Sequence, residues 1–420
     1  MLGGKQMRIA IIGGGAAGLA AAISAKRENS SALVTVYERK EDVAKKILAT
    51  GNGRCNFTNE EITSSFYNGD DPAFIETFLA ANGRDVLLEF MDSIGVVPVV
   101  KEGYYYPRSE QAAAIKDALK RMCLHLGVTL KNNNSVKRIH KEGAEFIIDA
   151  GKVFHADRVI LATGGQAAPV LGSDGSGYGL ATEMGHHVSC VTPALVPLLT
   201  SGKVLAKASG VRTRARATCH IAGCENYTSV GELQITDNGL SGIMIFQLSR
   251  HVSKALEAKK RAIIELDFLP EYPDEEVMIR FKEQIKRFPY FSVAGIFNSL
   301  LPEKLIQALL SLAGIKKSRL ANELREEEIT TLLRTVKAMP VTIRATKGFA
   351  SAQVCAGGVL TTEVDPLEMK SKRVDGLYIA GELLDVDGLC GGYNLHFAFT
   401  SGIIAGRMAV RKDETIDSNY

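Results

Sequence analysis

The sequence of 420 residues predicts an α/β protein in which a Rossmann-like domain, made from both ends of the chain, is interrupted by an inserted segment. Near the start, a Gly13-x-Gly15-x-x-Gly18 pattern separates an apolar run from an alanine-rich stretch. Two further apolar runs end in glycines, at Gly164 and Gly381. Between them, residues 193–340 change first to short strand-like runs and then to helical periodicity. Because a chain of 420 residues is too long for one ordinary hydrophobic core, we expect two or three domains.

The first βαβ unit follows the N-terminus. Residues 8–12 predict a short buried strand, residues 16–25 a helix and residues 33–37 a second strand. Basic residues before an apolar run also resemble a signal peptide, but the three glycines at 13–15 would break the helix that such a peptide forms. A strand, a glycine turn and a helix account for the same residues.

The expected Rossmann-like domain comprises residues 1–192 and 341–420. Its first part shows mostly helical periodicity over residues 72–126, interrupted at residues 103–107, and the alternation typical of strands over residues 135–148. Its last part ends in a helix from about residue 394 to 411. Strands that end in glycines occur in both parts, and we expect them to contribute to one nucleotide site. We therefore assign both parts to one domain.

The inserted segment is expected to hold two subdomains. Short strand-like runs with turn residues between them predict a β-barrel over residues 193–272. Helix starts at Pro273-Asp274 and Pro302-Glu303, with repeated apolar spacing, predict a helical subdomain over residues 273–340. No internal repeat relates the two.

Each glycine of the first turn has a separate task. Gly13 permits the tight turn, Gly15 lets the backbone approach a pyrophosphate, and Gly18 allows the helix to pack closely on the strand. The first N–H groups of the helix, at Ala16 and Ala17, can then bind phosphate oxygens. The turn therefore predicts a dinucleotide-binding site.

An acidic residue at the end of the second strand narrows the choice of nucleotide. Glu38 lies 20 positions after Gly18, where a carboxylate accepts hydrogen bonds from an adenosine ribose. An acid at this position argues against a 2′-phosphate and therefore against NADP in this site. We also place Arg39 and Val136 among the residues that bind the cofactor.

Two later segments favour FAD as the dinucleotide. Ala162-Thr163-Gly164 closes one buried strand, and Gly381-Glu382 closes another before Gly392-Tyr393-Asn394-Leu395 starts the last helix. This arrangement resembles the two-dinucleotide-binding flavoproteins, in which the late Gly–acid pair holds the ribitol chain and the last helix directs its N-terminus at the flavin. A reduced flavin carries negative charge, which a helix dipole stabilises. Only one complete fingerprint is present, so NAD(P)H would bind transiently at the flavin as reductant, or the electrons would come from another donor.

Residues 45–59 and 381–395 carry a more specific resemblance. The first segment is KKILATGNGRCNFTN, and the second is GELLDVDG followed by GGYNL. Together they are similar to the aminoacetone-oxidase-like flavoproteins, also called NAD(FAD)-utilising dehydrogenases, over essentially the whole chain. The resemblance implies an FAD domain built from both ends, with an inserted β-barrel and a helical subdomain. It also implies a flavin site that includes Lys45, Lys46, Gly51, Gly53, Arg54, Cys55 and Asn56.

The chain departs from that family pattern at two positions, with Cys390 in place of threonine and His396 in place of glutamine. Activities attached to family members include aminoacetone oxidation, reduction of bile acid intermediates and reduction of a uridine in ribosomal RNA. The resemblance therefore implies the cofactor more firmly than the substrate. We expect hydride transfer between FAD and a small organic molecule. An RNA-modifying flavoenzyme and a flavin-bound interaction protein without turnover are the alternatives.

Three residues are candidates for catalysis, each with a structural alternative. The Cys55 thiol would be a general acid opposite the flavin, or a packed cysteine that supports its loop. Arg54 would hold an anionic substrate or a flavin carbonyl. His396, in the first turn of the last helix, would be a neutral proton relay or a core histidine. For each residue, a catalytic role requires a side chain that can reach the flavin or substrate, whereas a structural role allows full burial. The burial of each side chain in the fold therefore distinguishes the two roles.

The insert carries a candidate surface for phosphates. Arg212, Arg214 and Arg216 alternate, so they project from one face of a strand. Further basic residues of the insert are Lys203, Lys207 and Lys254. A net charge of only +3 favours a solvated face with acid partners, and RNA binding is the alternative.

Seven scattered cysteines predict a reducing compartment, and we therefore expect a cytoplasmic protein. Cys219 and Cys224 lack a second pair of ligands, so we expect no metal site. No stretch is long enough to span a bilayer, and we expect no membrane partner. The expected partner is a small-molecule substrate, and the oligomeric state is left open.

Overall fold

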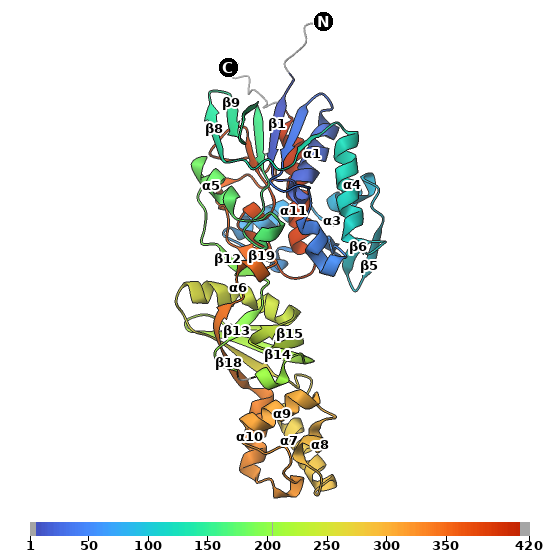
Figure 1. Ribbon diagram of the computed structural model, residues 1–420, viewed down its shortest axis with the longest axis vertical. Coiled ribbons are helices and arrows are strands. Elements are labelled where there is room, and N and C mark those ends of the chain that lie inside the picture. Colours follow the sequence, from blue (N-terminus) through green and yellow to red (C-terminus); the bar gives the residue numbers. More distant parts are fainter. Residues whose placement is uncertain (1–5, 204, 412–420) are drawn as a thin grey trace. The chain divides into compact units, whose positions relative to one another are not determined.

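The protein is described here by a computed structural model, which covers residues 6–203 and 205–411 and divides into two compact units (Figure 1). Unit 1 contains Met1–Val191 and Val354–Tyr420, whereas unit 2 contains Thr192–Gln353. Each unit has a hydrophobic core cluster of its own.

The α/β fold class with an inserted β-barrel and helices is confirmed by the sheets of the two units. One boundary differs from the expectation at residue 341. Strand β18 (Met339–Thr346) pairs with two barrel strands and buries Val341 and Ile343, so it belongs to the barrel. The chain returns to unit 1 only at Val354.

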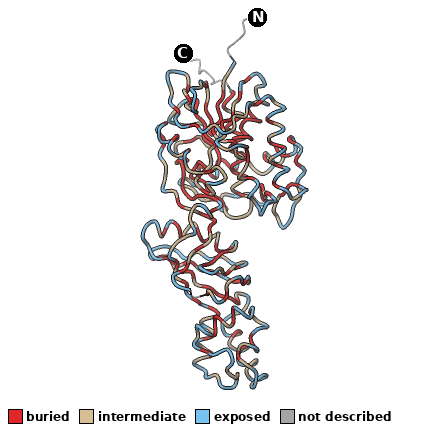
Figure 2. The backbone as a smooth tube through the Cα atoms, in the orientation of Figure 1, coloured by how far each residue is buried: buried red, intermediate tan, exposed pale blue. Residues whose placement is uncertain are grey.

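A five-stranded parallel sheet forms the centre of unit 1, where Figure 2 shows a concentration of buried residues. Its strands, in spatial order, are β20 (Leu377–Ile379), β11 (Arg158–Leu161), β1 (Arg8–Ile12), β2 (Leu33–Tyr37) and β7 (Thr129–Lys131). Most residues of β1 and β11 are buried, as expected for parallel strands covered on both faces. Because parallel strands share one direction, the glycine turns after β1, β11 and β20 emerge at the same edge.

The first and last helices of unit 1 pack with their backbones in close contact. They are α1 (Ala16–Glu28) and α11 (Tyr393–Ala409). A Cβ atom on Gly402 would lie 2.2 Å from the carbonyl oxygen of Ala17, and Gly406 meets α1 in the same way. Only glycine fits at these two positions, so the two ends of the chain are joined by direct backbone packing.

The remaining elements of unit 1 surround the sheet. The helices are α2 (Pro72–Ala81), α3 (Arg84–Ser93), α4 (Ala112–His125) and α5 (Ser176–Glu183). The strands are β3 (Thr58–Asn59), β4 (Tyr67–Gly69), β5 (Pro98–Lys101), β6 (Tyr104–Pro107), β8 (Arg138–Glu142), β9 (Glu145–Asp149), β10 (Val153–Ala156), β19 (Val354–Ala356) and β21 (Val386–Gly388). The β5–β6 hairpin interrupts the region expected to be mostly helical, because Glu102 and Gly103 both adopt positive φ and form its turn.

Unit 2 contains a closed six-stranded barrel and the helices that follow it. Around the barrel the strands are β13 (Leu198–Thr200), β16 (Gly239–Ser241), β15 (Tyr227–Thr236), β14 (Arg212–Ile221), β17 (Ala262–Asp267) and β18. The other elements are β12 (Thr192–Ala194), α6 (Ile243–Glu257), α7 (Asp274–Arg287), α8 (Val293–Phe297), α9 (Glu303–Leu312) and α10 (Glu326–Lys337). Apolar side chains of the barrel and of these helices share one core.

Candidate active site

The glycine turn between β1 and α1 leaves open space at the start of the helix. A Cβ atom on Gly13, whose φ is 108°, would lie 2.4 Å from the carbonyl oxygen of Ala162. A Cβ atom on Gly18 would lie 1.9 Å from the carbonyl oxygen of Gly13. At Gly15, in contrast, a Cβ atom would meet nothing within 4 Å. The fold itself therefore requires Gly13 and Gly18, whereas the space at Gly15 suits a ligand phosphate near the N–H groups of α1.

Glu38, at the end of β2, lies beside this turn. Its carboxylate accepts hydrogen bonds from the backbone N–H groups of Gly14 and Lys40, both at 2.8 Å. The next residue, Arg39, forms an ion pair with Asp174. Glu38 is thus fixed at the edge of the nucleotide site, where an adenosine ribose would be bound.

A second set of turns meets around Glu382. Lys46 Nζ lies 2.6 Å from Glu382 Oε2, and a Cβ atom on Gly164 would lie 3.9 Å from the same oxygen. Gly381 has a φ of 73°, and a Cβ atom there would lie 2.9 Å from the Cβ atom of Ala17. Segments that are far apart in the sequence therefore come together around the late Gly–acid pair.

The N-terminus of α11 holds a buried acceptor without a partner. Gly392 precedes the helix with a φ of 93°, and a Cβ atom there would lie 2.6 Å from Asn56 Oδ1. This Asn56 oxygen is buried and has no hydrogen-bond partner among the described residues. An unpaired buried acceptor is unfavourable, so a bound group that donates a hydrogen bond would stabilise it. The N3–H group of a flavin ring is such a donor, and its negatively charged reduced form would also suit the helix terminus.

Several predicted cofactor residues instead hold the chain around this terminus. The Asn394 side chain closes a turn, since its Oδ1 accepts from the Gly388 N–H and its Nδ2 donates to the Gly388 carbonyl, both at 2.8 Å. The Tyr393 ring stacks on Phe66 with centroids 4.9 Å apart. Leu395 is half-buried. Their side chains position the backbone of the site.

Other predicted cofactor residues lie at its edges. Lys45 forms an ion pair with Glu41 near the protein surface. Val136 is 9% exposed and lies between β7 and β8. Gly51 and Gly53 have φ values of 56° and 82°, which the turns of their loop require.

Cys55 is fully buried, with a φ of 59°. Burial raises the pKa of its thiol to about 12, against a hydrogen bond with Thr50 that lowers it. Without solvent access, and as so weak an acid, the thiol fits the structural alternative, a packed cysteine that supports its loop, better than a general acid.

Arg54 is accessible, in contrast to Cys55. Its side chain is 45% exposed, and its guanidinium carbon lies 4.9 Å from the centre of the Tyr106 ring. Glu110 Oε2 lies 3.8 Å from Arg54 Nη1. The planar cation is thus held by an aromatic face while its edge stays available to an anionic or carbonyl group.

His396 is fully buried in the first turn of α11. Its Nδ1 lies 2.9 Å from Thr58 Oγ1. Burial lowers the pKa of His396 to about 4, so the ring is neutral at neutral pH. The predicted neutral state agrees with this pKa, and the contact with Thr58 fits a core histidine that joins α11 to β3.

Cys355 and Tyr178, which no sequence pattern indicated, contact the turn after β11. Cys355 Sγ accepts a hydrogen bond from the Gln166 N–H at 3.1 Å. A Cβ atom on Gly165 would lie 2.9 Å from Tyr178 Oη and 3.2 Å from Cys355 Sγ. Burial raises the pKa of both groups, that of Cys355 to about 11, so both are neutral at pH 7. The two adjacent glycines at 357 and 358 were the sequence feature that could have drawn attention to the segment with Cys355.

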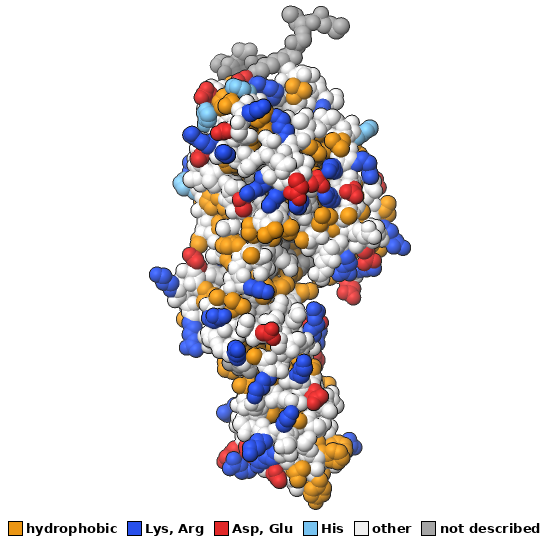
Figure 3. All heavy atoms as spheres, viewed as in Figure 1, with side chains coloured by type: hydrophobic (Ala, Val, Ile, Leu, Met, Phe, Trp, Pro, Cys, Tyr) orange, Lys and Arg blue, Asp and Glu red, His pale blue; other side chains and the backbone are white. Residues whose placement is uncertain are grey.

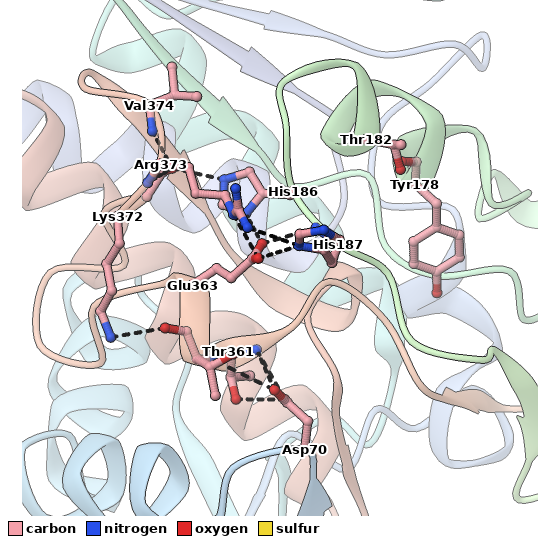
Figure 4. Close-up of polar contacts among 12 residues, drawn as sticks. Asp70, Tyr178, Thr182, His186, His187, Thr361, Glu363, Lys372, Arg373 and Val374 are labelled. Atoms are coloured by element: carbon pink, nitrogen blue, oxygen red, sulfur yellow. Dashed lines mark hydrogen bonds and ion pairs between the residues drawn. The ribbon is translucent and has the colours of Figure 1, made fainter.

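Figure 4 shows another polar cluster of unit 1, in which His186 lies close to Glu363. His186 Nδ1 lies 3.1 Å from Glu363 Oε2, and His186 Nε2 lies 2.8 Å from Ser371 Oγ. The acid, the histidine and the serine are thus in contact in the same spatial order as in the catalytic triad of a serine hydrolase. However, the buried Ser371 hydroxyl oxygen accepts hydrogen bonds from the N–H groups of Arg373 and Val374. The cluster stabilises the fold and presents no exposed nucleophile.

The predicted arginine face of unit 2 is neutralised by acids. Arg212 Nη1 lies 2.8 Å from Glu232, Arg214 Nε lies 3.0 Å from Glu271, and Arg216 Nη1 lies 3.6 Å from Asp267. These three ion pairs fit the alternative of a solvated strand face whose arginines have acidic partners.

Membrane-spanning helices and metal clusters were sought within residues 6–203 and 205–411. None of the helices there combines the length and apolar character needed to cross a bilayer. The same residues contain no group of three or more His, Cys, Asp or Glu side chains arranged to hold a metal ion.

Known proteins resemble this chain along most of its length. The family model described as HI0933-like protein Rossmann domain matches residues 7–408. A 3-dehydro-bile acid delta(4,6)-reductase from Clostridium scindens is 45% identical over 406 residues, which cover 96% of this chain and 99% of that protein. Ribosomal RNA dihydrouridine synthases from Haemophilus influenzae and Escherichia coli are 29% and 30% identical, and each match covers 93% of this chain and 95% of the relative.

These matches agree with the geometry of the site. The open space at Gly15 and the unpaired Asn56 oxygen fit a bound FAD, and the family model covers both. The predicted resemblance to two-dinucleotide-binding flavoproteins is confirmed. The chain belongs to the HI0933-like family of Rossmann-domain proteins and is an FAD-dependent oxidoreductase.

Proposed function

We propose that this enzyme reduces a carbon–carbon double bond conjugated with a carbonyl group, in a small apolar substrate of the steroid class. The observation that carries the proposal is the 45% identity to the 3-dehydro-bile acid delta(4,6)-reductase, which covers 96% of this chain and 99% of that protein. Similarity over both complete lengths supports a common reaction type more strongly than a common fold does.

The residues of unit 1 would bind the cofactor and stabilise charge. Bound FAD, once NAD(P)H has reduced it by two electrons, would supply the electron pair to the substrate as a hydride. The start of α1 at Gly15 would bind the pyrophosphate, and Glu38 would bind the ribose. Asn56 would accept a hydrogen bond from the flavin ring, beside the N-terminus of α11. One carbon of the double bond would gain the hydride and the other a proton from water. The C=C bond would thus become a single bond with two new C–H bonds.

Arg54 is the residue that we propose to contact the substrate. Its exposed guanidinium, held over Tyr106, would bind the carbonyl oxygen or a carboxylate of the substrate. Cys55 and His396 would act through their packing, because both are fully buried. NAD(P)H is proposed as the reductant, and it would bind transiently at the flavin, since the sequence holds no second dinucleotide fingerprint.

Modification of ribosomal RNA is the second candidate function. Relatives that are 29% and 30% identical carry that activity in their names, which is the observation in its favour. It is the weaker candidate because the identity is lower and because the arginines of the barrel face each have an acidic neighbour.

Anaerobic flavin absorbance separates the candidates. We expect NADH or NADPH to bleach the flavin of the purified enzyme, and a 3-oxo-Δ4,6 steroid to restore its absorbance with formation of the reduced steroid. Ribosomal RNA should not restore it. The proposal fails if the reduced enzyme is reoxidised by the RNA and not by the steroid. Arg54→Lys and Arg54→Ala should weaken steroid turnover progressively, without loss of bound flavin.

We also propose a cytoplasmic location. All seven cysteines are free, and Cys190 and Cys224 are exposed. Exposed thiols persist in reducing compartments. Fractionation of cells should find the enzyme with cytoplasmic markers, and recovery from the cell exterior would contradict this location.

A further inference from the structure

The helical part of unit 2 carries exposed apolar side chains that the proposed reaction does not use. After α7, a loop presents Phe288, Tyr290 and Phe291, which are 36%, 77% and 63% exposed. We call these three residues the aromatic tip. Ile279 on α7 and Leu312 at the end of α9 are 56% and 45% exposed. Exposed apolar clusters of this kind mark interaction surfaces more often than isolated exposed residues do.

Basic side chains flank the aromatic tip. Lys286 and Arg287 form the last turn of α7, directly before it. On its other side, the segment with Lys316 and Lys317 is joined to the chain after the tip, since the Ala294 N–H donates to the Lys317 carbonyl. These four basic residues are exposed, and none forms an ion pair with another described residue. Figure 3 shows hydrophobic and basic side chains gathered at this helical end of the unit.

We propose that the aromatic tip inserts into the surface of an anionic lipid bilayer, while the flanking cations bind the lipid headgroups. Aromatic rings with neighbouring Lys and Arg side chains are suited to the boundary between headgroups and acyl chains. This contact departs from the expectation of no membrane partner, which rested on the lack of a stretch long enough to span a bilayer.

The shape of the tip favours a bilayer over a nucleic acid. The Phe288 and Phe291 rings meet at 75°, with centroids 5.5 Å apart. Because the edge of one ring meets the other, the pair offers no flat platform on which a base could stack. Lys282, in contrast, is paired with Glu326 at 2.8 Å, so it lies outside the proposed headgroup site.

Vesicle sedimentation with the complete, flavin-loaded enzyme tests the proposal. We expect binding to vesicles of phosphatidylcholine with phosphatidylglycerol, weak binding to phosphatidylcholine alone, and loss of binding at high salt. Tyr290→Ser with Phe291→Ser should lower the bound fraction about tenfold, through lost apolar insertion. Lys286→Glu with Arg287→Glu should lower it at least about tenfold as well. The thermal unfolding transition of unit 2, which contains the tip, should be unchanged in each variant, which verifies that this unit is folded.

Matched controls lie elsewhere on the surface. Val170→Ser removes an apolar residue of unit 1 that is 77% exposed, and Lys259→Glu with Lys260→Glu reverses an exposed basic pair of unit 2. Both controls should bind vesicles like the parent enzyme. The proposal is overturned if the tip variants also do so, or if the parent binds no vesicles. It is equally overturned if the tip variants instead abolish self-association without lipid, or binding of ribosomal RNA without lipid.

Discussion

At the scale of single residues, Gly15 and Gly18 belong to one turn but should respond differently to substitution. Gly15→Ala adds a methyl group to open space, so the free energy of unfolding of the apoprotein should change by less than about 0.5 kcal/mol, while FAD affinity falls about tenfold or more. Gly18→Ala meets the Gly13 carbonyl at 1.9 Å and should destabilise the apoprotein by about 2 kcal/mol. Thermal unfolding and flavin titration measure the two effects, and equal loss of stability in both variants would contradict the assignment.

Asn56 provides a second test of the flavin site. Its buried Oδ1 has no partner in the described part of the chain, so Asn56→Leu should leave the stability of the apoprotein unchanged or raise it slightly. With FAD bound, the same substitution would leave the flavin N3–H unpaired and should weaken binding by about 1–3 kcal/mol. Flavin titration alongside denaturant unfolding separates the two states. A variant that loses apoprotein stability while it keeps FAD affinity would show that Asn56 is structural.

Residues that are fixed by local geometry were predictable from the sequence, and residues that are fixed by distant contacts were not. Gly13 and Gly18 are constrained within one turn and were identified by their spacing. Cys355 contacts Gln166, far away in the sequence, and no local pattern indicates that contact. The burial of Cys55 likewise depends on its surroundings, which is why its two alternatives could not be separated before the fold was known.

At the scale of elements, a charged cluster joins the segment after α5 to η7 (Thr361–Glu363) and makes the stability of unit 1 depend on pH. Burial would raise the pKa of Glu363, but hydrogen bonds with His187 and Arg373 outweigh it and hold this pKa at about 2. An unfolded chain titrates Glu at about pH 4.3. Because the folded pKa is depressed, the stabilisation is present above pH 4.3 and is lost as the pH falls toward 2.

Glu363→Gln should therefore lower the free energy of unfolding by on the order of 2 kcal/mol at pH 7, and the difference from the parent should shrink between pH 5 and about 2. Denaturant unfolding across this pH range measures the effect. Glu142→Gln is the control, because the Glu142 side chain is 69% exposed beside His140 and should contribute little. A difference at Glu363 that does not vary with pH would contradict the assigned pKa.

The elements of the first βαβ unit were predicted at nearly their observed bounds, because each has the periodicity of its own structure. Strand β14 was also predicted at residues 212–221, where alternation is clear. The interruption of the helical region at residues 103–107 was predicted, but its structure as the β5–β6 hairpin was not, since its apolar residues do not alternate. β18 was assigned to the wrong domain because its barrel partners, β13 and β17, lie far back in the sequence.

At the scale of the whole molecule, the two hydrophobic cores divide the chain more clearly than any linker does. The core of unit 1 takes its residues from both ends of the chain, and the core of unit 2 takes its residues only from the insert. All the residues that we assign to FAD lie in unit 1. Cofactor binding should therefore stabilise one core and not the other.

Calorimetry of the apoprotein should resolve two unfolding transitions, one for each core. FAD at 100 times its dissociation constant should stabilise unit 1 by about 2.7 kcal/mol and raise the temperature of its transition only. The transition of unit 2 should instead respond to Leu309→Ala, which removes a fully buried side chain from that core and should destabilise it by about 2–5 kcal/mol. A single transition that moves as a whole with both FAD and Leu309→Ala would show that the two cores unfold together.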